Sequence, residues 1–476
     1  MEEKIIFNKT KVIATVGPAS NSKEMLTKLI KAGADVFRLN FSHGTHEDHK
    51  KVINLIKKIN EELNTNITML QDLQGPKIRL GEMKDGVEIV EGDEFIITTE
   101  NIVGDHLMGS TVYTSLPNDV NVGDMILIDD GKIEVKVSKV EGNKVFTTVV
   151  YGGPVKSRKG INLPQSNVSA PSLTEKDKKD LEFGLDHDVE WVALSFVRKA
   201  EDIIYLRDLI EKRGKSTKII AKIEKPEALR NADEIIEASD AIMVARGDLG
   251  VEIVMEEVPM VQKELVLKCN DAAKPVIIAT QMMESMIENA RPTRAETNDV
   301  ANAVLDGADA VMLSAETAAG KYPIEVVKSM VRTISNIENH ELIYYNHELP
   351  NKDSDHYYND TLILSACRLA KATKAKAITG MTFSGYTAFQ LSSNRPKAGI
   401  FIFTHNRPLL KTVNLIWGVR GFYYDKEVST DDTFSDIEKI LVDAGHLSKG
   451  DIVINTASMP LRAKGRANAI KMCVVE

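Results

Sequence analysis

Short apolar runs alternate with longer amphipathic stretches along most of the chain. The apolar runs predict eight strands, at residues 11–16, 35–41, 67–73, 191–196, 218–223, 241–246, 275–280 and 310–314. Between most of them, helical spacing of apolar residues predicts helices such as 23–32, 47–63, 199–213 and 256–273. Ser172 and Glu175 have the spacing of a capping box, which predicts the start of a further helix. Eight strand–helix units predict an α/β fold that closes into a TIM (β/α)8 barrel.

The third strand–helix unit is interrupted by a different pattern. Short alternating strands follow one another there, with turn signals at Asp129-Asp130-Gly131 and Glu141-Gly142-Asn143. We therefore expect a small all-β domain inserted at residues 75–164. The remaining residues, 1–74 and 165–345, would form a barrel of about the usual 250 residues.

Residues 346–476 show an alternation of their own. The pattern predicts helices at 359–372, 385–393, 407–416 and 433–444, and strands at 376–381, 399–403 and 451–455. Strands and helices that alternate in this way indicate a separate C-terminal α/β domain.

Composition narrows the class of protein. No apolar run reaches the roughly 18 to 20 residues of a membrane span, so no membrane partner is expected. A net charge of −9 argues against nucleic acid as the main partner. The start of the chain carries no signal-peptide pattern, and the three cysteines lie far apart in sequence. We expect a cytoplasmic protein with reduced thiols.

Charged residues end two neighbouring strands of the predicted barrel. Lys222 and Glu224 are two residues apart and point the same way on an extended strand, and Asp248 follows the next strand. The carboxyl ends of barrel strands are where active sites lie. One ammonium and two carboxylates there suit a divalent metal beside a phosphate. A buried ion-pair network without catalytic function is the competing interpretation.

Polar groups converge from nearly every other strand end. They are Arg38, Asn40, Ser42, Asp72, Arg79, Ser195, Arg246, Thr280, Gln281, Ser314 and Glu316. Two carboxylates without His or Cys suit a hard cation such as Mg²⁺. Arg38 and Arg79 can grip phosphate through planar guanidinium groups. No Walker loop and no protein-kinase signature is present, but phosphoryl transfer needs mainly positioning and charge neutralisation.

Several segments, in order and spacing, resemble the pyruvate kinase family over nearly the whole chain. They are RLNFSHG (38–44), QGPKIR (74–79), KGINLP (159–164), KIE (222–224), MVARGDLG (243–250), ATQMMESM (279–286), PTRAE (292–296) and DAVMLSAETAAGKYP (309–323). The resemblance implies a barrel, a β lid inserted after its third strand and a C-terminal regulatory domain. It also implies transfer of the phosphoryl group of phosphoenolpyruvate to ADP, giving pyruvate and ATP in glycolysis.

The resemblance further implies the roles of single residues. The metal, Mg²⁺ or Mn²⁺, is implied at Glu224 and Asp248. Substrate binding is implied at Arg38, Lys222, Arg246, Gly247, Asp248 and Thr280. Catalysis is implied at Lys222, Arg38, Thr280, Ser314 and Glu316, the last two through a water chain that protonates the enolate. Nucleotide contacts are implied at Pro18, Asn40, His43, Arg79 and Lys159. Ser195 would hold the catalytic side chains in place without contacting the substrate.

One departure concerns potassium. The family's monovalent-cation site is implied at Asn40, Ser42, Asp72 and the carbonyl of Leu73. Potassium-dependent members carry Glu where this chain has Lys77, so the chain is similar to the potassium-independent branch. A lysine ammonium is a tethered monovalent cation, and we expect it to neutralise Asp72 and make K⁺ unnecessary. A solvated lysine at the lid hinge is the alternative.

Hydroxyl groups also gather before a predicted C-terminal helix. They belong to the loop 382–387, whose candidate anion ligands are Thr382, Ser384, Gly385 and Thr387. The resemblance implies an effector phosphate there, from a sugar monophosphate or AMP, and a homotetramer. An ordinary capped helix start is the alternative.

Two other functions compete with this interpretation. A Mg²⁺-dependent aldolase or lyase also stabilises a pyruvate enolate on such a barrel, but it needs neither inserted lid nor C-terminal domain. A non-catalytic metabolite sensor would be expected to have lost Lys222, Glu224 or Asp248, and the chain retains all three.

Overall fold

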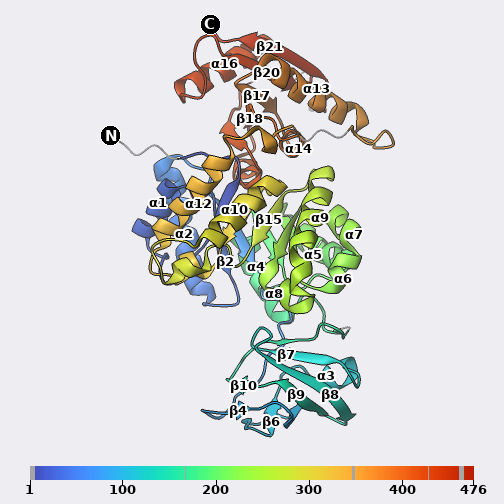
Figure 1. The fold of residues 1–476 in the computed structure, drawn as a ribbon. Helices are drawn as coiled ribbons and strands as arrows, with labels where there is room; N and C mark the ends of the chain where they lie inside the picture. The colour runs from blue at the N-terminus through green and yellow to red at the C-terminus, as the bar shows by residue number, and fades with distance from the viewer. Residues whose placement is uncertain (1–5, 167, 346–348, 427, 460–465) are drawn as a thin grey trace.

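The computed structural model describes residues 6–476 apart from 167, 346–348, 427 and 460–465. A barrel occupies the middle of the molecule, an inserted β domain lies at one end and a C-terminal α/β domain at the other (Figure 1). The three parts agree with the predicted fold class. The boundary predicted at 346 falls on residues outside the described part of the chain, and the domain limits stay predictions.

Eight parallel strands close the barrel, as predicted. Neighbouring strands follow the order β1, β16, β15, β14, β13, β12, β3, β2. Their bounds are β1 Lys11–Thr15, β2 Val36–Asn40, β3 Thr68–Asp72, β12 Trp191–Leu194, β13 Lys218–Ile223, β14 Ala241–Ala245, β15 Val276–Ala279 and β16 Ala310–Leu313. Large side chains such as Trp191, Leu70 and Met243 fill the interior, so the barrel is a packed core.

Helices surround this barrel. The main ones are α1 Lys23–Ala32, α2 His46–Leu63, α4 Glu175–Asp186, α5 Ala200–Lys212, α6 Pro226–Arg230, α7 Ala232–Ala238, α9 Val258–Asp271, α10 Arg294–Asp306 and α12 Pro323–Ile337. Short helices α8 Arg246–Glu252 and α11 Ala315–Ala318 follow β14 and β16 directly. The helix predicted at 256–273 begins instead as a 3₁₀ turn, Met255–Glu257, and the α-helix starts with Pro259 in its first turn.

The capping box predicted at Ser172 and Glu175 is wrong by two residues. Thr174 is the N-cap of α4, and its hydroxyl accepts from the Asp177 amide. The Asp177 carboxylate accepts from the Thr174 amide at 2.9 Å. Both pairs have the required spacing in sequence, and the helix begins after Thr174 because Ser172 is still buried in the segment that leads to it.

The inserted domain is built from short strands and has its own apolar core. Six strands follow the order β11, β7, β8, β9, β5, β6, and β10 pairs with β4. Their bounds, with one short helix, are β4 Glu88–Ile89, β5 Glu94–Thr98, β6 Met108–Ser110, α3 Leu116–Asp119, β7 Met125–Ile128, β8 Ile133–Glu141, β9 Lys144–Tyr151, β10 Gly153–Pro154 and β11 Ile161–Asn162. Both predicted turns lie between paired strands, and Asp129, Asp130 and Gly131 all have positive φ.

The C-terminal domain carries a five-stranded sheet in the order β19, β18, β17, β20, β21. Its elements are α13 Tyr357–Thr373, β17 Ala377–Met381, α14 Tyr386–Ser393, β18 Gly399–Thr404, α15 Arg407–Thr412, β19 Val419–Tyr423, α16 Thr430–Asp443, β20 Ile452–Ala457 and β21 Ala469–Val474. The sequence pattern missed the two edge strands, β19 and β21, because several of their side chains stay exposed and the apolar signal is weak. The helix predicted at 407–416 ends at Thr412 and continues as a 3₁₀ turn.

The C-terminal domain packs against the barrel end opposite the inserted domain (Figure 1). There the buried Arg395 guanidinium pairs with Asp309, which directly precedes β16, at 3.0 Å. None of the helices in the described part of the chain is long and apolar enough to cross a membrane.

Candidate active site

The carboxyl ends of the barrel strands face the inserted domain. A cavity of about 510 Å³ opens there. The start of α8 lines it with Arg246, Gly247 and Asp248, Asp130 lines it from the β7–β8 turn, and Lys77 from the connection into the inserted domain. Of the predicted polar residues, Arg246, Asp248 and Gln281 therefore border a cavity between two domains.

Lys222 lies at the centre of the cluster. Its Nζ is 2.9 Å from Glu224 Oε1 and 3.3 Å from Asp72 Oδ1, and it donates to Ser195 Oγ at 2.7 Å. Burial alone would lower the pKa of Lys222, but the two carboxylates outweigh it and raise the pKa above its ordinary value. Lys222 is therefore a fixed positive charge at the mouth of the barrel.

Asp72 holds two cations in place. Arg38 Nε donates to Asp72 Oδ2 at 2.6 Å, and Arg38 Nη1 donates to the Thr15 hydroxyl at 3.0 Å. Burial acts to raise the pKa of Asp72, but Lys222 and Arg38 lower it below its ordinary value. The carboxylate stays ionised and orients Arg38 beside Lys222.

Glu224 is fully buried, and its two oxygens differ. Oε2 accepts from the Phe196 amide at 2.7 Å. Oε1 has no hydrogen bond of suitable geometry among the described residues, although the Lys222 ammonium faces it. Burial raises the pKa of Glu224, with Asp248 adding repulsion. An incompletely satisfied carboxylate oxygen near a second carboxylate fits a site for a divalent cation.

Asp248 would be the second ligand of such a cation. Its side chain is 27 % exposed and borders the cavity. Carboxylate oxygens are the ligands that Mg²⁺ and Mn²⁺ prefer, and substrate oxygens and water can complete the shell. Within the described ranges, no group of three or more His, Cys, Asp or Glu side chains is placed to hold a metal ion. A cation held by Glu224 and Asp248 would therefore need further oxygens from water and substrate to complete its shell.

The first turn of α8 is held by β15 and α10. The Arg246 side chain forms two bonds to Asp299, at 2.6 and 2.7 Å, and one to the Thr280 carbonyl at 2.8 Å. The Gly247 amide donates to Thr280 Oγ1 at 2.7 Å. Thr280 and Gln281 have φ of 71° and 55°, a conformation that non-glycine residues adopt at functional sites. The Arg246 side chain thus anchors the start of α8, and the Gly247 amide is already paired with Thr280.

Ser314 and Glu316 lie at the end of β16 as predicted. Glu316 accepts from the Ser314 amide at 2.6 Å and from the Met283 amide at 3.3 Å. Burial raises the pKa of Glu316. Both oxygens therefore hold backbone in place, and the predicted water chain stays a prediction.

The prediction that Lys77 neutralises Asp72 is wrong in this structure. The Lys77 Nζ lies 3.3 Å from Asp248 Oδ1, because the connection into the inserted domain passes α8. Asp72 is already paired with Arg38 and Lys222.

The other predicted cation ligands already make internal contacts. Asn40 Oδ1 accepts from the Ser42 amide at 3.1 Å, and the Leu73 carbonyl accepts from Ser195 Oγ at 2.8 Å.

The predicted nucleotide contacts divide between two parts of the molecule. Pro18 is exposed on the β1–α1 loop, Asn40 is the last residue of β2, and His43 follows that strand. On the inserted-domain side, Lys159 Nζ pairs with Asp129 at 2.8 Å, and Arg79 donates to a backbone carbonyl. The structure does not bring the two groups into contact.

The predicted effector loop precedes α14. Gly385 has a φ of 91°, and its amide donates to Thr382 Oγ1 at 3.0 Å. Ser384 Oγ accepts from the Tyr386 amide at 3.4 Å, and Thr387 is buried. The Tyr386 hydroxyl donates to Asp360 at 2.6 Å, so this side chain is tied to α13.

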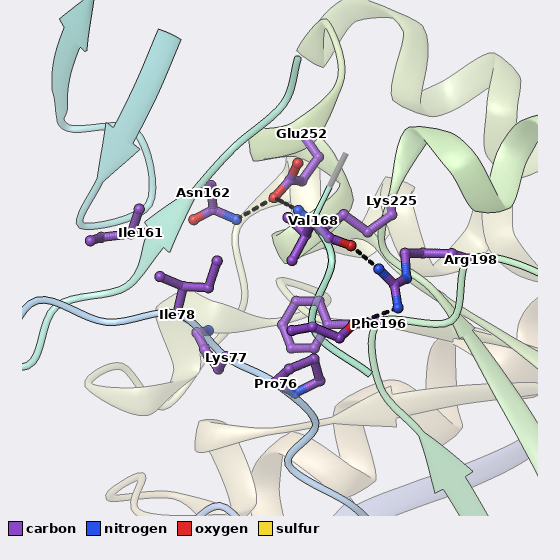
Figure 2. Close-up of a pocket in the computed structure, with 11 residues that line it drawn as sticks. Pro76, Lys77, Ile78, Ile161, Asn162, Val168, Phe196, Arg198, Lys225 and Glu252 are labelled. Atoms are coloured by element: carbon purple, nitrogen blue, oxygen red, sulfur yellow. Dashed lines mark hydrogen bonds and ion pairs between the residues drawn. The ribbon is translucent and has the colours of Figure 1, made fainter. Parts of the chain in front are cut away.

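The sequence did not predict four buried or half-buried residues that contact one another or the chain beside them. They are Asn162, Arg198, Lys225 and Glu252, which line a second, smaller cavity at the base of the inserted domain (Figure 2). A usable signal existed for Glu252, which stands four residues after Asp248 and so shares its helix face.

The chain is similar to known proteins over nearly its whole length. Residues 7–327 match the family model of the pyruvate kinase barrel domain, and residues 360–473 match that of the pyruvate kinase alpha/beta domain. A pyruvate kinase of Clostridium acetobutylicum is 43 % identical over 475 residues, which cover 99 % of this chain and 100 % of the relative. One of Geobacillus stearothermophilus is 42 % identical over 479 residues, with 98 % and 80 % covered.

A solved structure shows the same architecture. The crystal structure of a pyruvate kinase from Cryptosporidium parvum superposes with a TM-score of 0.92 at 33 % sequence identity. The match covers 100 % of this chain and 99 % of the other.

Proposed function

The chain belongs to the pyruvate kinase family, and on that premise we propose that Lys222, Glu224 and Asp248 carry out its phosphoryl transfer with a divalent metal. The protein is a phosphotransferase, a pyruvate kinase. Phosphoenolpyruvate and ADP are the substrates that the family implies. The observation that carries the proposal is the buried Lys222 ammonium, placed 2.9 Å from Glu224 at the mouth of the barrel.

Each group has a physical task in this proposal. Glu224 and Asp248 would hold Mg²⁺ or Mn²⁺, which supplies Lewis acidity to the phosphate and enolate oxygens when bound. The α8 amides of Gly247 and Asp248 would receive the substrate carboxylate, and the Gly247 amide would exchange its bond to Thr280 Oγ1 for one to the substrate. Arg38 grips the transferring phosphoryl group.

Lys222 neutralises negative charge as it develops on the enolate oxygen. The ammonium is already fixed by Asp72 and Ser195, so little reorganisation is needed. Ser314 and Glu316 border the path by which a proton would reach the enolate carbon. Pro18, Asn40, His43, Arg79 and Lys159 would contact ADP, which requires the inserted domain to close over the barrel.

We also propose that the activity does not depend on K⁺. Lys77 brings a tethered ammonium to the cavity rim, although at Asp248 and not at Asp72. The Lys77 ammonium would then supply part of the positive charge that neutralises the phosphate, so a bound monovalent cation is not needed for it. We further propose a homotetramer in the cytoplasm, activated when a phosphate of a sugar monophosphate or AMP binds at 382–387.

Potassium titration tests the role of Lys77. We expect near-full activity in tetramethylammonium buffer without K⁺. Lys77→Glu removes the tethered cation and adds a negative charge, so activity should fall sharply without K⁺ and recover when KCl is added. Ionic strength is held constant because salt alone screens phosphate binding. A strong K⁺ requirement in the unmodified protein would contradict the proposal.

A further inference from the structure

Helix α8 holds both connections between the barrel and the inserted domain. The outgoing connection contributes Lys77, whose Nζ lies 3.3 Å from Asp248. The returning connection contributes Asn162 on β11, whose amide donates to Glu252 Oε1 at 2.8 Å (Figure 2). Asp248 and Glu252 are one turn apart on α8, so two separate segments of the inserted domain meet one face of a seven-residue helix.

Glu252 is also joined to the segment that follows β13. The Lys225 ammonium donates to Glu252 Oε1 at 2.6 Å, and both side chains are at most 9 % exposed. Lys225 directly follows Glu224 in sequence. The ion pair therefore links the segment that carries one carboxylate of the site to the helix that carries the other.

The arrangement leaves one strong acceptor unused. Glu252 Oε2 is buried and has no hydrogen-bond partner in the described part of the chain. A buried carboxylate oxygen without a hydrogen bond costs folding free energy. The contacts that Lys225 and Asn162 make with the other oxygen of Glu252 offset this cost. Nearby, Arg198 donates to the carbonyls of Val168 and Ala170, which fixes the rest of the returning connection (Figure 2).

We propose that Glu252 is a positioning residue that sets the separation of Glu224 and Asp248 and couples it to the position of the inserted domain. Through Lys225 it locates Glu224, and through the helix it locates Asp248. Through the hydrogen bond from Asn162 it contacts the returning connection of the inserted domain. Movement of the inserted domain then shifts the metal carboxylates, and metal binding in turn orders the connection. The inference rests on the metal role proposed for Glu224 and Asp248.

Two changes separate the two links. The double variant Lys225→Met with Glu252→Gln removes the ion pair without leaving a buried charge unpaired. Asn162→Leu removes the bond to the inserted domain and keeps the ion pair. Glu141→Gln is the control, because it breaks an exposed ion pair with Lys139 inside the inserted domain and outside residues 158–166. Circular dichroism confirms that each full-length variant is folded.

The first measurement is Mn²⁺ binding without substrates. The electron paramagnetic resonance signal of free Mn²⁺ reports how much of the ion remains unbound. We expect the double variant to bind Mn²⁺ roughly tenfold more weakly or worse, the usual effect of removing a partner that orients metal ligands. Amide hydrogen exchange of residues 158–166 is the second measurement. We expect Mn²⁺ to slow this exchange in the unmodified protein and in Glu141→Gln, but not in Asn162→Leu.

Steady-state kinetics give a third measurement. We expect Asn162→Leu to raise the Michaelis constant for ADP more than that for phosphoenolpyruvate, because only the inserted-domain link is lost. A merely structural role would change neither constant selectively.

Unchanged Mn²⁺ affinity in the folded double variant would overturn the inference, provided that Glu224→Gln loses Mn²⁺. If Glu224→Gln also binds Mn²⁺ normally, the metal role itself is wrong and the inference falls with it. Exchange of residues 158–166 that ignores Mn²⁺ in the unmodified protein would overturn the coupling to the inserted domain.

Discussion

Single buried ionisable groups set the electrostatics of the barrel. Burial disfavours the charged form of each group, and the neighbouring charges decide whether it stays ionised. Lys222 keeps its charge because two carboxylates face it. Glu190, which directly precedes β12 at the other end of the barrel, lacks such close support. The nearest ammonium, that of Lys411, is 3.7 Å away, and the Met69 amide donates to its carboxyl group. Burial therefore raises the pKa of Glu190 to about 7.

This raised pKa predicts a pH-dependent stability. Between the ordinary pKa of 4.5 and the folded pKa of about 7, the folded state binds the proton more tightly than the unfolded state. The contribution of Glu190 is most favourable below pH 4.5 and is lost as pH rises to 7. The loss is on the order of 3 kcal/mol. Glu190→Gln should thus be more stable than the unmodified protein at pH 8, with the difference shrinking towards pH 5.

Urea unfolding of both proteins from pH 5 to pH 8 checks the sign. Glu182→Gln is the control, because Glu182 is exposed on α4. A stability difference that does not depend on pH would show that Glu190 does not titrate in this range.

At the scale of elements, α4 joins both ends of the insertion. Thr174 caps the helix where the chain returns from the inserted domain. Asp177, in the same first turn, accepts from the Gly75 amide at 3.1 Å, where the chain leaves. The capping box therefore stabilises a helix and also the base of the inserted domain.

Removing the cap should be measurable on its own. Thr174→Ala loses the hydroxyl that accepts from the Asp177 amide, so we expect a loss of about 1 kcal/mol in stability. Thr174→Ser keeps the hydroxyl and is the matched control. Thermal unfolding of the two variants compares them, and equal midpoints would mean that the cap contributes nothing.

The elements also show what sequence can predict. The eight barrel strands were predictable because burial on both faces leaves uninterrupted apolar runs. β19 and β21 were not, because edge strands expose side chains and carry little pattern. The partner of Lys77 was missed for another reason: sequence places it five residues after Asp72, but only the path of the chain past α8 shows that it reaches Asp248. Glu252 was missed because its contacts join segments far apart in sequence.

At the scale of the whole molecule, the C-terminal domain and the inserted domain lie at opposite ends of the barrel (Figure 1). An effector at 382–387 would therefore act over the length of the barrel. The buried pair between Arg395 and Asp309 is one contact that joins the C-terminal domain to the barrel.

A charge change in the loop tests the proposed effector. Ser384→Asp should repel phosphate and abolish activation by AMP or a sugar monophosphate while leaving basal turnover intact. Ser365→Asp, on the exposed face of α13 in the same domain, is the control. The activity is measured at low phosphoenolpyruvate with and without each compound. Normal activation of the Ser384→Asp variant would place the effector elsewhere.

We propose that Lys222 and a divalent metal at Glu224 and Asp248 perform the phosphoryl transfer. Steady-state formation of pyruvate from phosphoenolpyruvate and ADP, with Mg²⁺ titrated against EDTA, tests it most directly in the unmodified protein, in Lys222→Met and in the control Lys218→Met at the other end of β13. We expect no turnover in EDTA, and a kcat lowered by roughly 10²–10³ in Lys222→Met with little change in the Michaelis constants. Full turnover in EDTA, or an effect of Lys222→Met on the Michaelis constants alone, would contradict it.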